Sequence, residues 1–550
     1  MSDAQETTNS GPEKPTPAAE TSEPAEKSEA APSGAKSEVA AEIAAGYTFD
    51  GPALRLGAVL HEDEVHTDAK VQIPLSMMNR HGLIAGATGT GKTKTLQLIA
   101  EQLSDAGVPV FAADVKSDLS GLMQAGAAND KITERSQQVG DDWTPTAYPV
   151  EFYSLGGDKG QGTPLRATVT AFGPILLSKV LGLNNTQESS LQLMFHWADQ
   201  QGLPLLDLKD LRSVITYLTS DEGKSELAEI GGVSKQTAGV ILREVSGLQN
   251  SGGDEFFGEP EFDTMDLLSA RGEQGVISLI ELAKVQDRPQ LFSTFLMWLL
   301  ADLYADLPEV GDADKPKLVF FFDEAHLLFN DASKAFLDAV TQTVRLVRSK
   351  GVGVFFVTQR PTDVPAEVLA QLGNRVQHAL RAFTPDDATA LSKTVKTYPK
   401  TPAYDLEQAL TQLGTGEAIV TVMSEKGAPT PVAWTRLPAP RSAMQPAAPE
   451  QFAQAVAGSA QMAKYGEAVD RDSAYERLAK KTQGAGEDVP RDGDTAPKQK
   501  AQPKAAAKAK PKKEKSLVEE VLGNSAVKQF MRTAASSIAR NLFGTGRRKR

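Results

Sequence analysis

The sequence predicts an α/β fold in which helices cover a mostly parallel β-sheet. Strongly apolar runs of strand length alternate with helical patterns through the middle of the chain. Near-continuous apolar runs are typical of strands that are buried on both faces, as in a parallel sheet. A glycine-rich stretch, GATGTGKTKT, starts at Gly86 between one such run and a helical pattern. Because 550 residues are too many for one compact core, we also expect further parts around it.

Composition divides the chain into five parts. Residues 1–45 are rich in Ala, Pro and Glu and poor in apolar bulk, so we expect a disordered acidic tail. Residues 46–445 carry the core patterns, and residues 446–479 are expected to form a helical extension. Residues 480–515 read as a basic, low-complexity linker. In residues 516–550 apolar side chains recur at roughly helical spacing among basic ones, which predicts an amphipathic, basic C-terminal helix.

Six apolar runs in the core are expected to form strands. They span residues 81–86, 108–115, 317–325, 351–359, 375–382 and 416–423. The stretch from about residue 120 to 310 is too long for one crossover, so we expect an inserted subdomain there. Its middle, residues 175–250, has a helical pattern. The apolar stretch 291–307 is broken by Asp302 and predicts a buried helix instead of a membrane span.

Composition also excludes several kinds of site. The chain has no cysteine, so disulfides, thiolate metal sites and cysteine nucleophiles are absent. His196, His326 and His378 lack the spacing of zinc ligands. The chain starts without a secretory signal pattern, which leads us to expect a cytoplasmic protein. The net charge of −13 hides a basic end, because residues 498–550 hold 15 Lys and Arg against three Glu.

The stretch at Gly86 contains the complete phosphate-loop pattern G-x-x-x-x-G-K-[ST]. Glycines allow several backbone N–H groups to point at one phosphate cluster, and the helix that follows adds positive potential. We expect Lys92 to reach the β- and γ-phosphates and the Thr93 hydroxyl to bind Mg²⁺. The residues predicted to contact the nucleotide are Gly86, Ala87, Thr88, Gly89, Thr90, Gly91, Lys92, Thr93 and Lys94.

A pair of acidic residues, Asp323 and Glu324, follows the apolar run LVFFF. The carboxyl edge of an open α/β sheet is where ligands bind, so we expect Asp323 to hold Mg²⁺ and Glu324 to polarise a water. A second strand, GVGVFFVTQ, ends in Gln359, which would sense the γ-phosphate or orient the water. The predicted catalytic residues are therefore Lys92, Glu324 and Gln359. The alternatives, a solvated acidic turn and a solvent-facing strand end, stay open.

Two further sets of residues have less specific patterns. ADVKSDLSGL (113–122) places Asp114 and Lys116 after a strand, where they would join the site, line a subunit boundary or form an ordinary turn. A ring ATPase also needs an arginine supplied across a subunit boundary. The candidates for this arginine finger are Arg345, Arg348, Arg375 and Arg381, and the sequence does not choose among them.

Together these segments resemble the bacterial HerA-like ATPase family, a branch of the HerA/FtsK superfamily of ring-forming DNA motors. The segments are GATGTGKTKT, ADVKSDLSGL, KLVFFFDEAHLLF, RLVRSKGVGVFFVTQRPTDVP and LGNRVQHALRAFTP. The resemblance covers roughly residues 48–445 and touches AASSIARNLFG near the C-terminus. It implies a RecA-like P-loop NTPase core, hexameric rings, and the roles of Lys92, Thr93, Asp323, Glu324 and Gln359 given above. HerA helicases carry an N-terminal barrel before the motor, whereas here only residues 46–85 separate the tail from Gly86.

The leading hypothesis for function is an Mg²⁺-dependent ATPase that moves along double-stranded DNA as a hexameric ring. The basic tail and the ring channel would hold the phosphate backbone without reading sequence. A second hypothesis is a ring ATPase that remodels a protein assembly, which the net negative charge favours. A third is a nucleotide-dependent switch with little turnover, against which Glu324 argues. For the C-terminal helix, docking on a neighbouring subunit is preferred to contact with an anionic membrane.

Overall fold

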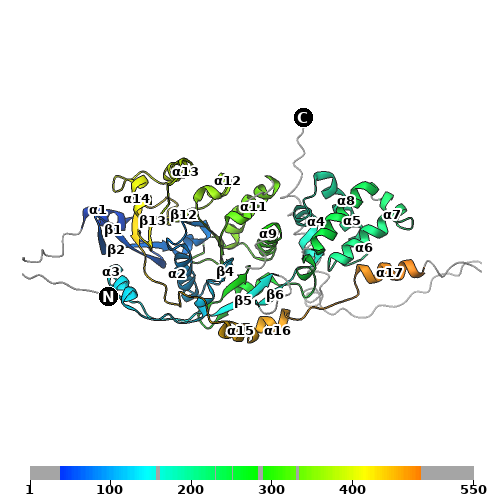
Figure 1. The fold of residues 1–550 in the computed structure, drawn as a ribbon, viewed down its shortest axis with the longest axis horizontal. Helices are drawn as coiled ribbons and strands as arrows, with labels where there is room; N and C mark the ends of the chain where they lie inside the picture. The colour runs from blue at the N-terminus through cyan, green and yellow to red at the C-terminus, as the bar shows by residue number, and fades with distance from the viewer. Residues whose placement is uncertain are drawn as a thin grey trace, which may run out of the picture.

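The computed structural model describes residues 37–155, 161–229, 231–250, 252–282, 289–311, 313–329 and 334–484 (Figure 1). Within these residues a single sheet of twelve strands runs through the molecule, in the order β2-β1-β14-β13-β12-β3-β11-β10-β4-β9-β5-β6. The predicted basic linker beyond residue 484 and the predicted C-terminal helix lie outside the described residues, as do residues 1–36 of the predicted acidic tail.

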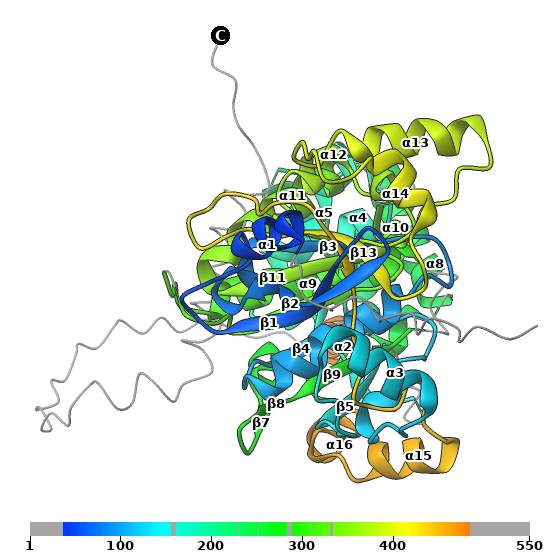
Figure 2. The ribbon, with the colours of Figure 1, turned by 90° about the vertical axis from the view of Figure 1, so that its left-hand side faces the viewer.

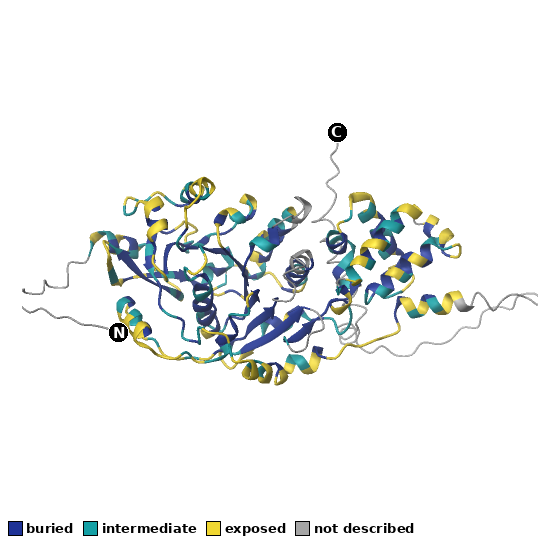
Figure 3. Ribbon diagram, in the orientation of Figure 1, coloured by how far each residue is buried: buried dark blue, intermediate teal, exposed yellow. Residues whose placement is uncertain are grey.

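The larger part of the sheet is parallel. From β12 to β6 every neighbouring pair of strands is parallel. These strands are β12 (Asn374–Gln377), β3 (Gly82–Ala85), β11 (Val352–Thr358), β10 (Leu318–Phe322), β4 (Val110–Asp114), β9 (Ile277–Glu281), β5 (Val150–Leu155) and β6 (Thr163–Leu165). Nearly all of their residues are buried, as the dark strands in Figure 3 show. The predicted α/β class with a mostly parallel sheet is confirmed.

An antiparallel end completes the sheet. It consists of β13 (Glu417–Thr421), β14 (Ala433–Arg436), β1 (Ala53–His61) and β2 (Glu64–Pro74). The six predicted strands correspond to β3, β4, β10, β11, β12 and β13. The search for near-continuous apolar runs did not identify the other six strands of the sheet, β1, β2, β5, β6, β9 and β14. Strand β2 is largely exposed over its first half, so it lacks the continuous apolar run used to find the others.

The two faces of the sheet are covered by different helices. Alternate residues of a strand point to opposite faces, and β10 follows this rule. Its Phe320 and Phe322 join one apolar cluster with α9 (Pro289–Asp306) and α11 (Lys334–Val347). Val319 and Phe321 join the other cluster with α2 (Lys92–Asp105). Both faces of the central strand are therefore sealed, which leaves only the strand ends for chemistry.

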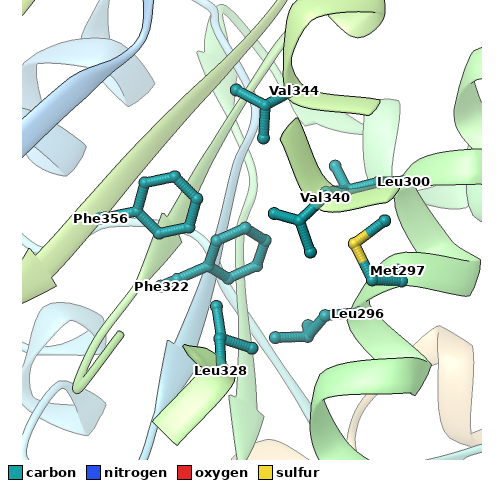
Figure 4. A pocket seen from close by; sticks show the side chains of 8 residues that line it. All are labelled: Leu296, Met297, Leu300, Phe322, Leu328, Val340, Val344 and Phe356. Carbon is teal, nitrogen blue, oxygen red and sulfur yellow. The ribbon is translucent and has the colours of Figure 1, made fainter. Parts of the chain in front are cut away.

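A small apolar cavity of about 10 Å³ lies behind the carboxyl half of β10 (Figure 4). Its lining residues come from α9, α11, β10, β11 and α10 (His326–Phe329). They are Leu296, Met297, Leu300, Phe322, Leu328, Val340, Val344 and Phe356. A cavity of this size with no polar lining does not hold a water. The described lining behind the end of β10 is therefore entirely apolar.

A group of helices fills much of the long connection between β4 and β10. It comprises α4 (Val169–Val180), α5 (Asn185–Gln200), α6 (Leu208–Thr219), α7 (Lys224–Glu229) and α8 (Lys235–Asn250), grouped at the right of Figure 1. The same connection also contains β5, β6 and β9, which belong to the central sheet. Helix α9 is buried from Phe295 to Leu300, and Thr264 donates a hydrogen bond of 2.8 Å to its Asp302. Among the described helices, none combines the length and apolar character needed to cross a bilayer.

The N-terminal boundary differs from the expected one. Residues Glu38–Ala45, assigned from composition to the acidic tail, form helix α1. Ser37 caps this helix, because its hydroxyl accepts a hydrogen bond from the backbone N–H of Ala40. Ile43 is buried, and the fully buried Tyr47 donates to the carbonyl of Val420 over 2.9 Å. The stretch has few large apolar residues among many Ala and Glu. Its composition therefore did not predict the helix.

The C-terminal part of the described chain crosses the molecule below the sheet. Helices α15 (Pro449–Ala457) and α16 (Ala460–Tyr465) pack beside β5 and β6 (Figure 2). Helix α17 (Ala474–Gly484) reaches α6, where the N–H of Tyr475 donates to Asp210 over 2.9 Å. The remaining elements are α3 (Asp130–Val139), α12 (Ala366–Leu369), α13 (Pro385–Val395), α14 (Leu406–Gln412) and the short pair β7 (Ala270–Arg271) and β8 (Gln274–Gly275).

Candidate functional site

The phosphate-loop segment connects β3 to α2 and is tied to the ends of three other strands. The N–H of Gly86 donates to the carbonyl of Thr358 at the end of β11, over 3.2 Å. The N–H of Ala87 donates to Ala379, just beyond β12, over 2.8 Å. The carbonyl of Thr90 accepts from Gly416, which precedes β13, over 3.1 Å. The loop is therefore held in shape by the sheet before any ligand binds.

Two glycines of this loop are required by its geometry. Gly86 has φ of +155°, and a Cβ there would lie 2.5 Å from the Cβ of His378. Gly91 has φ of +118° and forms the N-cap of α2 without any side-chain cap. The first N–H groups of a helix need acceptors, and an uncapped N-terminus with its positive dipole is a site for anions. The loop and the start of α2 therefore suit a phosphate group.

Lys92 and Thr93 begin helix α2 at this loop. The Lys92 side chain is buried, and its ammonium donates to the carbonyl of Ala87 over 3.2 Å. Burial lowers the pKa of Lys92, and the nearby Glu324 carboxylate partly offsets that effect. Thr93 is half-buried. The side chain of Lys94 points elsewhere, because its ammonium donates to the carbonyl of Met444 over 2.7 Å.

Asp323 and Glu324 follow β10 and are buried, with relative exposures of 3% and 5%. Oδ1 of Asp323 accepts the backbone N–H of Glu324 over 2.8 Å, whereas Oδ2 is buried without a hydrogen-bond partner. Burial, followed by repulsion from Glu324, raises the pKa of Asp323 to about 7. A buried carboxylate oxygen without a partner fits a cation, so the residues present are compatible with Mg²⁺.

Glu324 has an unusual backbone conformation, with φ of +47°. This left-handed conformation is uncommon for residues other than glycine and is often found at functional sites. The Glu324 carboxylate contacts the ammonium of Lys116, and its Oε2 lies 3.3 Å from Nδ1 of His326. Burial alone would raise the pKa of Glu324, but the hydrogen bond and charge of Lys116 outweigh it and lower that pKa. Glu324 is therefore held as a carboxylate.

The end of β4 brings Asp114 and Lys116 into the same region. Strand β4 lies between β10 and β9, with Ala113 paired to Phe322, so Asp114 falls beside Asp323. Burial, followed by the charge of Glu281, raises the pKa of Asp114 to about 7. Of the interpretations left open for these residues, the structure favours a place at the candidate site for both.

Gln359 directly follows β11, the strand between β3 and β10. Thr358 pairs with Ala85, so Gln359 stands beside the start of the phosphate loop. The Gln359 side chain is exposed and lines a cleft of about 430 Å³ together with Thr88, His326 and Arg381. The structure therefore brings the sequence-predicted residues Lys92, Thr93, Asp323, Glu324 and Gln359 to the carboxyl edge of three adjacent strands.

The four candidate arginines have different surroundings. Arg381 is exposed beside the phosphate loop of its own chain, with Nη2 3.5 Å from the carbonyl of Thr88. Arg375 donates to the carbonyl of Thr397 over 3.2 Å and lies over the ring of Tyr398. Arg345 and Arg348 are exposed and precede β11, at the amino end of that strand. An arginine that acts on a neighbouring subunit has to be exposed, and Arg375 fits this requirement least.

Two residues at the site were not found from the sequence. His378 is fully buried beneath the loop, where Nδ1 donates to the carbonyl of Glu417 and Nε2 accepts from the Thr95 hydroxyl, both over 2.8 Å. Burial lowers the pKa of His378 to about 4, so the imidazole is neutral. Glu281, at the end of β9, receives a hydrogen bond from Ser117. No local pattern marks either residue, because both are placed by strand order.

Comparison with known proteins gives one family and several relatives. The sequence profile described as "Helicase HerA-like C-terminal" matches residues 60–550. The protein named "DNA double-strand break repair helicase HerA" from Sulfolobus acidocaldarius is 20% identical over 374 residues, which are 65% of this chain and 65% of the relative. Its namesake from Pyrococcus furiosus is 22% identical over 412 residues, 68% of each chain. A Methanocaldococcus jannaschii protein, "Probable helicase MJECL08", is 30% identical over 154 residues, 26% of this chain and 28% of the relative.

The matches thus span from about a quarter to about two thirds of the length of these curated relatives. Among solved structures, the plasmid coupling protein TrwB in complex with ADP and Mg²⁺ aligns at 16% identity with a TM-score of 0.47. That alignment covers 72% of this chain and 98% of TrwB. VirB4 of Thermoanaerobacter pseudethanolicus aligns at 14% identity with a TM-score of 0.46, covering 70% of this chain and 97% of VirB4.

Proposed function

The chain belongs to the helicase HerA-like C-terminal family, and from this premise we propose that it is an ATP-hydrolysing ring motor that moves along double-stranded DNA. The observation that carries the proposal is the adjacency of β3, β11 and β10. Their ends place an uncapped phosphate-binding helix next to two buried carboxylates. A chance phosphate-binding loop would not be accompanied by this second group of residues.

Each residue of the site has a proposed role. The loop from Gly86 to Gly91 and the start of α2 bind the phosphates, and Lys92 supplies positive charge within the loop. Thr93 and Asp323 hold Mg²⁺, whose charge, when bound, neutralises phosphate oxygens. Glu324 accepts a proton from the attacking water, because its carboxylate directly follows Asp323 at the carboxyl end of β10. Gln359 orients that water from the neighbouring strand.

The buried setting of the site supports hydrolysis. Both faces of β10 are sealed by aromatic and aliphatic side chains, so water reaches the carboxylates only from the strand ends. Electrostatic interactions are stronger in such a setting than in bulk water. The sealed strand therefore keeps Asp323 and Glu324 in one place relative to the loop, as transfer of a phosphoryl group to water requires.

DNA as the track is supported by two observations outside the site. Relatives that align over most of this chain are named DNA double-strand break repair helicases. The end of the sequence carries 15 Lys and Arg against three Glu in residues 498–550. Such a segment binds phosphate backbones without sequence preference. We further propose a homohexamer, with an arginine from one subunit completing the site of the next.

The test of hydrolysis compares two substitutions at the site. Lys92→Ala should abolish nucleotide binding and turnover. Glu324→Gln should lower turnover by about 10²-fold or more, the range for a general base, while the affinity for ATP is kept. Turnover is measured by phosphate release with Mg²⁺ present, and affinity by anisotropy of a fluorescent ATP analogue. Lys426→Ala, an exposed lysine after β13, is the matched control. Unchanged turnover in Glu324→Gln would reject the proposed base.

A second candidate is a ring ATPase that remodels a protein assembly. The formal net charge of −13 favours this candidate, because an acidic surface repels DNA outside the basic segment. The two candidates share the ATPase site and differ in the partner. Affinity capture with the Glu324→Gln variant, which would hold ATP, separates them. Recovery of protein without nucleic acid supports the second candidate, and recovery of DNA supports the first.

A further inference from the structure

The loop after β4 places a lysine on the proposed catalytic base. The ammonium of Lys116 contacts Oε1 of Glu324, which is buried, whereas the Lys116 side chain is 47% exposed. The same carboxylate has His326 on its other oxygen, with Nδ1 at 3.3 Å. An oxygen that accepts a charge-assisted hydrogen bond is a poorer base toward water, because part of its electron density is already shared. In this arrangement Oε1 of Glu324 is therefore not free to act, whereas Oε2 lies beside His326 without a hydrogen bond.

The conformation that presents Lys116 is built by the residues around it. The carboxylate of Asp114 accepts the N–H groups of Lys116, Asp118 and Leu119 over 3.1, 3.3 and 2.9 Å, which folds the loop over the end of β4. Ser117 has φ of +57° and donates from its hydroxyl to Glu281. These contacts fix the direction of the Lys116 backbone. The contact with Glu324 is thus a feature of the loop and not a chance position of a surface lysine.

We propose that Lys116 is a positioning residue that holds Glu324 in a resting arrangement, and that hydrolysis requires Lys116 to release this carboxylate. The inference rests on the proposed function, because it takes Glu324 as the base. The exposed Lys116 side chain can swing away at small cost, since it is bound at its tip only. Anionic oxygens of a nucleoside triphosphate at the phosphate loop would compete with Glu324 for its ammonium. Binding of the nucleoside triphosphate would then release Glu324 from Lys116.

The test uses the full-length protein and five variants. Lys116→Met keeps the length of the side chain and removes the charge, and Lys116→Arg keeps the charge. Glu324→Gln and the double variant Lys116→Met/Glu324→Gln complete a double-mutant cycle. Lys426→Met is the control for the loss of an exposed charge. Turnover without DNA is measured at ATP concentrations below KM and at saturating Mg²⁺, so that the release of Glu324 still has to occur in each turnover. Melting temperatures are measured without nucleotide and with a non-hydrolysable ATP analogue, which gives a readout independent of turnover.

Lys116→Met is expected to raise turnover by about two- to fivefold, the size of effect of a partly exposed ion pair. Lys116→Arg, which keeps the charge, should raise turnover less than Lys116→Met, and the double variant Lys116→Met/Glu324→Gln should be as slow as Glu324→Gln alone. Without nucleotide, Lys116→Met should lower the melting temperature more in the wild-type background than in the Glu324→Gln background. This difference should vanish once the ATP analogue is bound.

Turnover that is unchanged or reduced in Lys116→Met would overturn the inference. The inference would also be overturned if the melting temperatures showed no coupling between positions 116 and 324 without nucleotide. A coupling that stayed equally large with the ATP analogue bound would overturn it as well. Failure of the proposed function has a different signature. In that case the wild type would hydrolyse ATP no faster than Lys92→Ala does. The melting cycle would then still decide whether Lys116 holds Glu324.

Discussion

Single residues at this site carry charges that the fold controls. Burial lowers the pKa of Lys92 and raises the pKa of Asp114 and of Asp323 to about 7, whereas the hydrogen bond and charge of Lys116 outweigh burial at Glu324 and lower its pKa. Groups that titrate near neutrality at the mouth of a parallel sheet are typical of functional sites. A cation bound among these carboxylates would reverse the shift of Asp323, because it favours the charged form.

Gly86 is the residue where close approach matters most. In Gly86→Ala the new Cβ would meet His378 at 2.5 Å, and the residue would also need φ of +155°. We expect a loss of stability of about 2–4 kcal/mol from overpacking and backbone strain, and a loss of ATP affinity. Urea unfolding and nucleotide binding are the measurements.

The control for Gly86 is Gly427→Ala. Gly427 has φ of +76°, but a Cβ at this position would have nothing within 4 Å, so that substitution carries backbone strain alone. It should cost about 1 kcal/mol and leave ATP affinity unchanged. Equal losses of stability and affinity in both variants would show that the His378 contact is not the cause.

Asp114 predicts a specific pH dependence of stability. Its pKa is about 7 in the folded chain and 3.8 ordinarily, so between these values the folded state binds more protons than the unfolded state. Stability from this group is therefore lost as pH rises from about 4 to 7. Relative to Asp114→Asn, the unfolding free energy of the wild type should fall by on the order of 4 kcal/mol across that window.

The measurement for Asp114 is urea unfolding at several pH values without nucleotide and with a metal chelator. The difference between wild type and Asp114→Asn cancels the titration of groups that do not interact with Asp114. A difference that stays constant between about pH 4 and 8 would mean that Asp114 keeps an ordinary pKa in the folded chain.

At the scale of elements, α2 is held from its outer side as well as from the sheet. Three side chains on one face of α2 form hydrogen bonds with the backbone of the segment 441–444. They are Lys94, Gln97 and Glu101. The buried Glu101 carboxylate accepts the N–H groups of Arg441 and Ser442 over 2.8 and 3.0 Å. The helix that starts at the phosphate loop is thereby connected to the chain that continues into α15, α16 and α17.

Glu101→Ala should destabilise the protein by about 2–4 kcal/mol, because the N–H groups of Arg441 and Ser442 and the O–H of Ser442 lose the acceptor that they share. Glu134→Ala on α3 is the matched control, since that side chain is exposed. Denaturant midpoints of both variants provide the measurement. An effect of Glu101→Ala no larger than that of Glu134→Ala would mean that the segment 441–444 is held by other contacts.

Elements with a strong local pattern were predictable, and those defined by their neighbours were not. The apolar runs LVFFF and GVGVFFVTQ predict strands. The phosphate loop and the pair Asp323–Glu324 are recognised from short motifs. Strand β9 and the hairpin β1–β2 gain their places from pairing with distant strands. His378, Glu281 and the contact of Lys116 with Glu324 depend on strand order, which residue patterns do not encode. Helix α1 was missed because two buried apolar residues hold it within an acidic composition.

The whole molecule combines a sealed sheet, a side group of helices and charged ends. We continue to propose that residues 46–445 act as the motor domain and that residues 498–550 contribute basic charge for DNA. The net charge of −13 means that attraction to DNA comes from local regions and not from the chain as a whole. Binding through phosphates should therefore weaken steeply as salt increases.

ATP turnover of the full-length protein with and without long double-stranded DNA tests the central claim most directly. At about 50 mM salt we predict that DNA raises turnover several-fold, that the gain is lost toward about 200 mM, and that Glu324→Gln shows no gain. Phosphate release at saturating ATP and Mg²⁺ is the readout. Wild-type turnover that depends on Lys92 but does not respond to double-stranded DNA at low salt would contradict the account of a DNA motor.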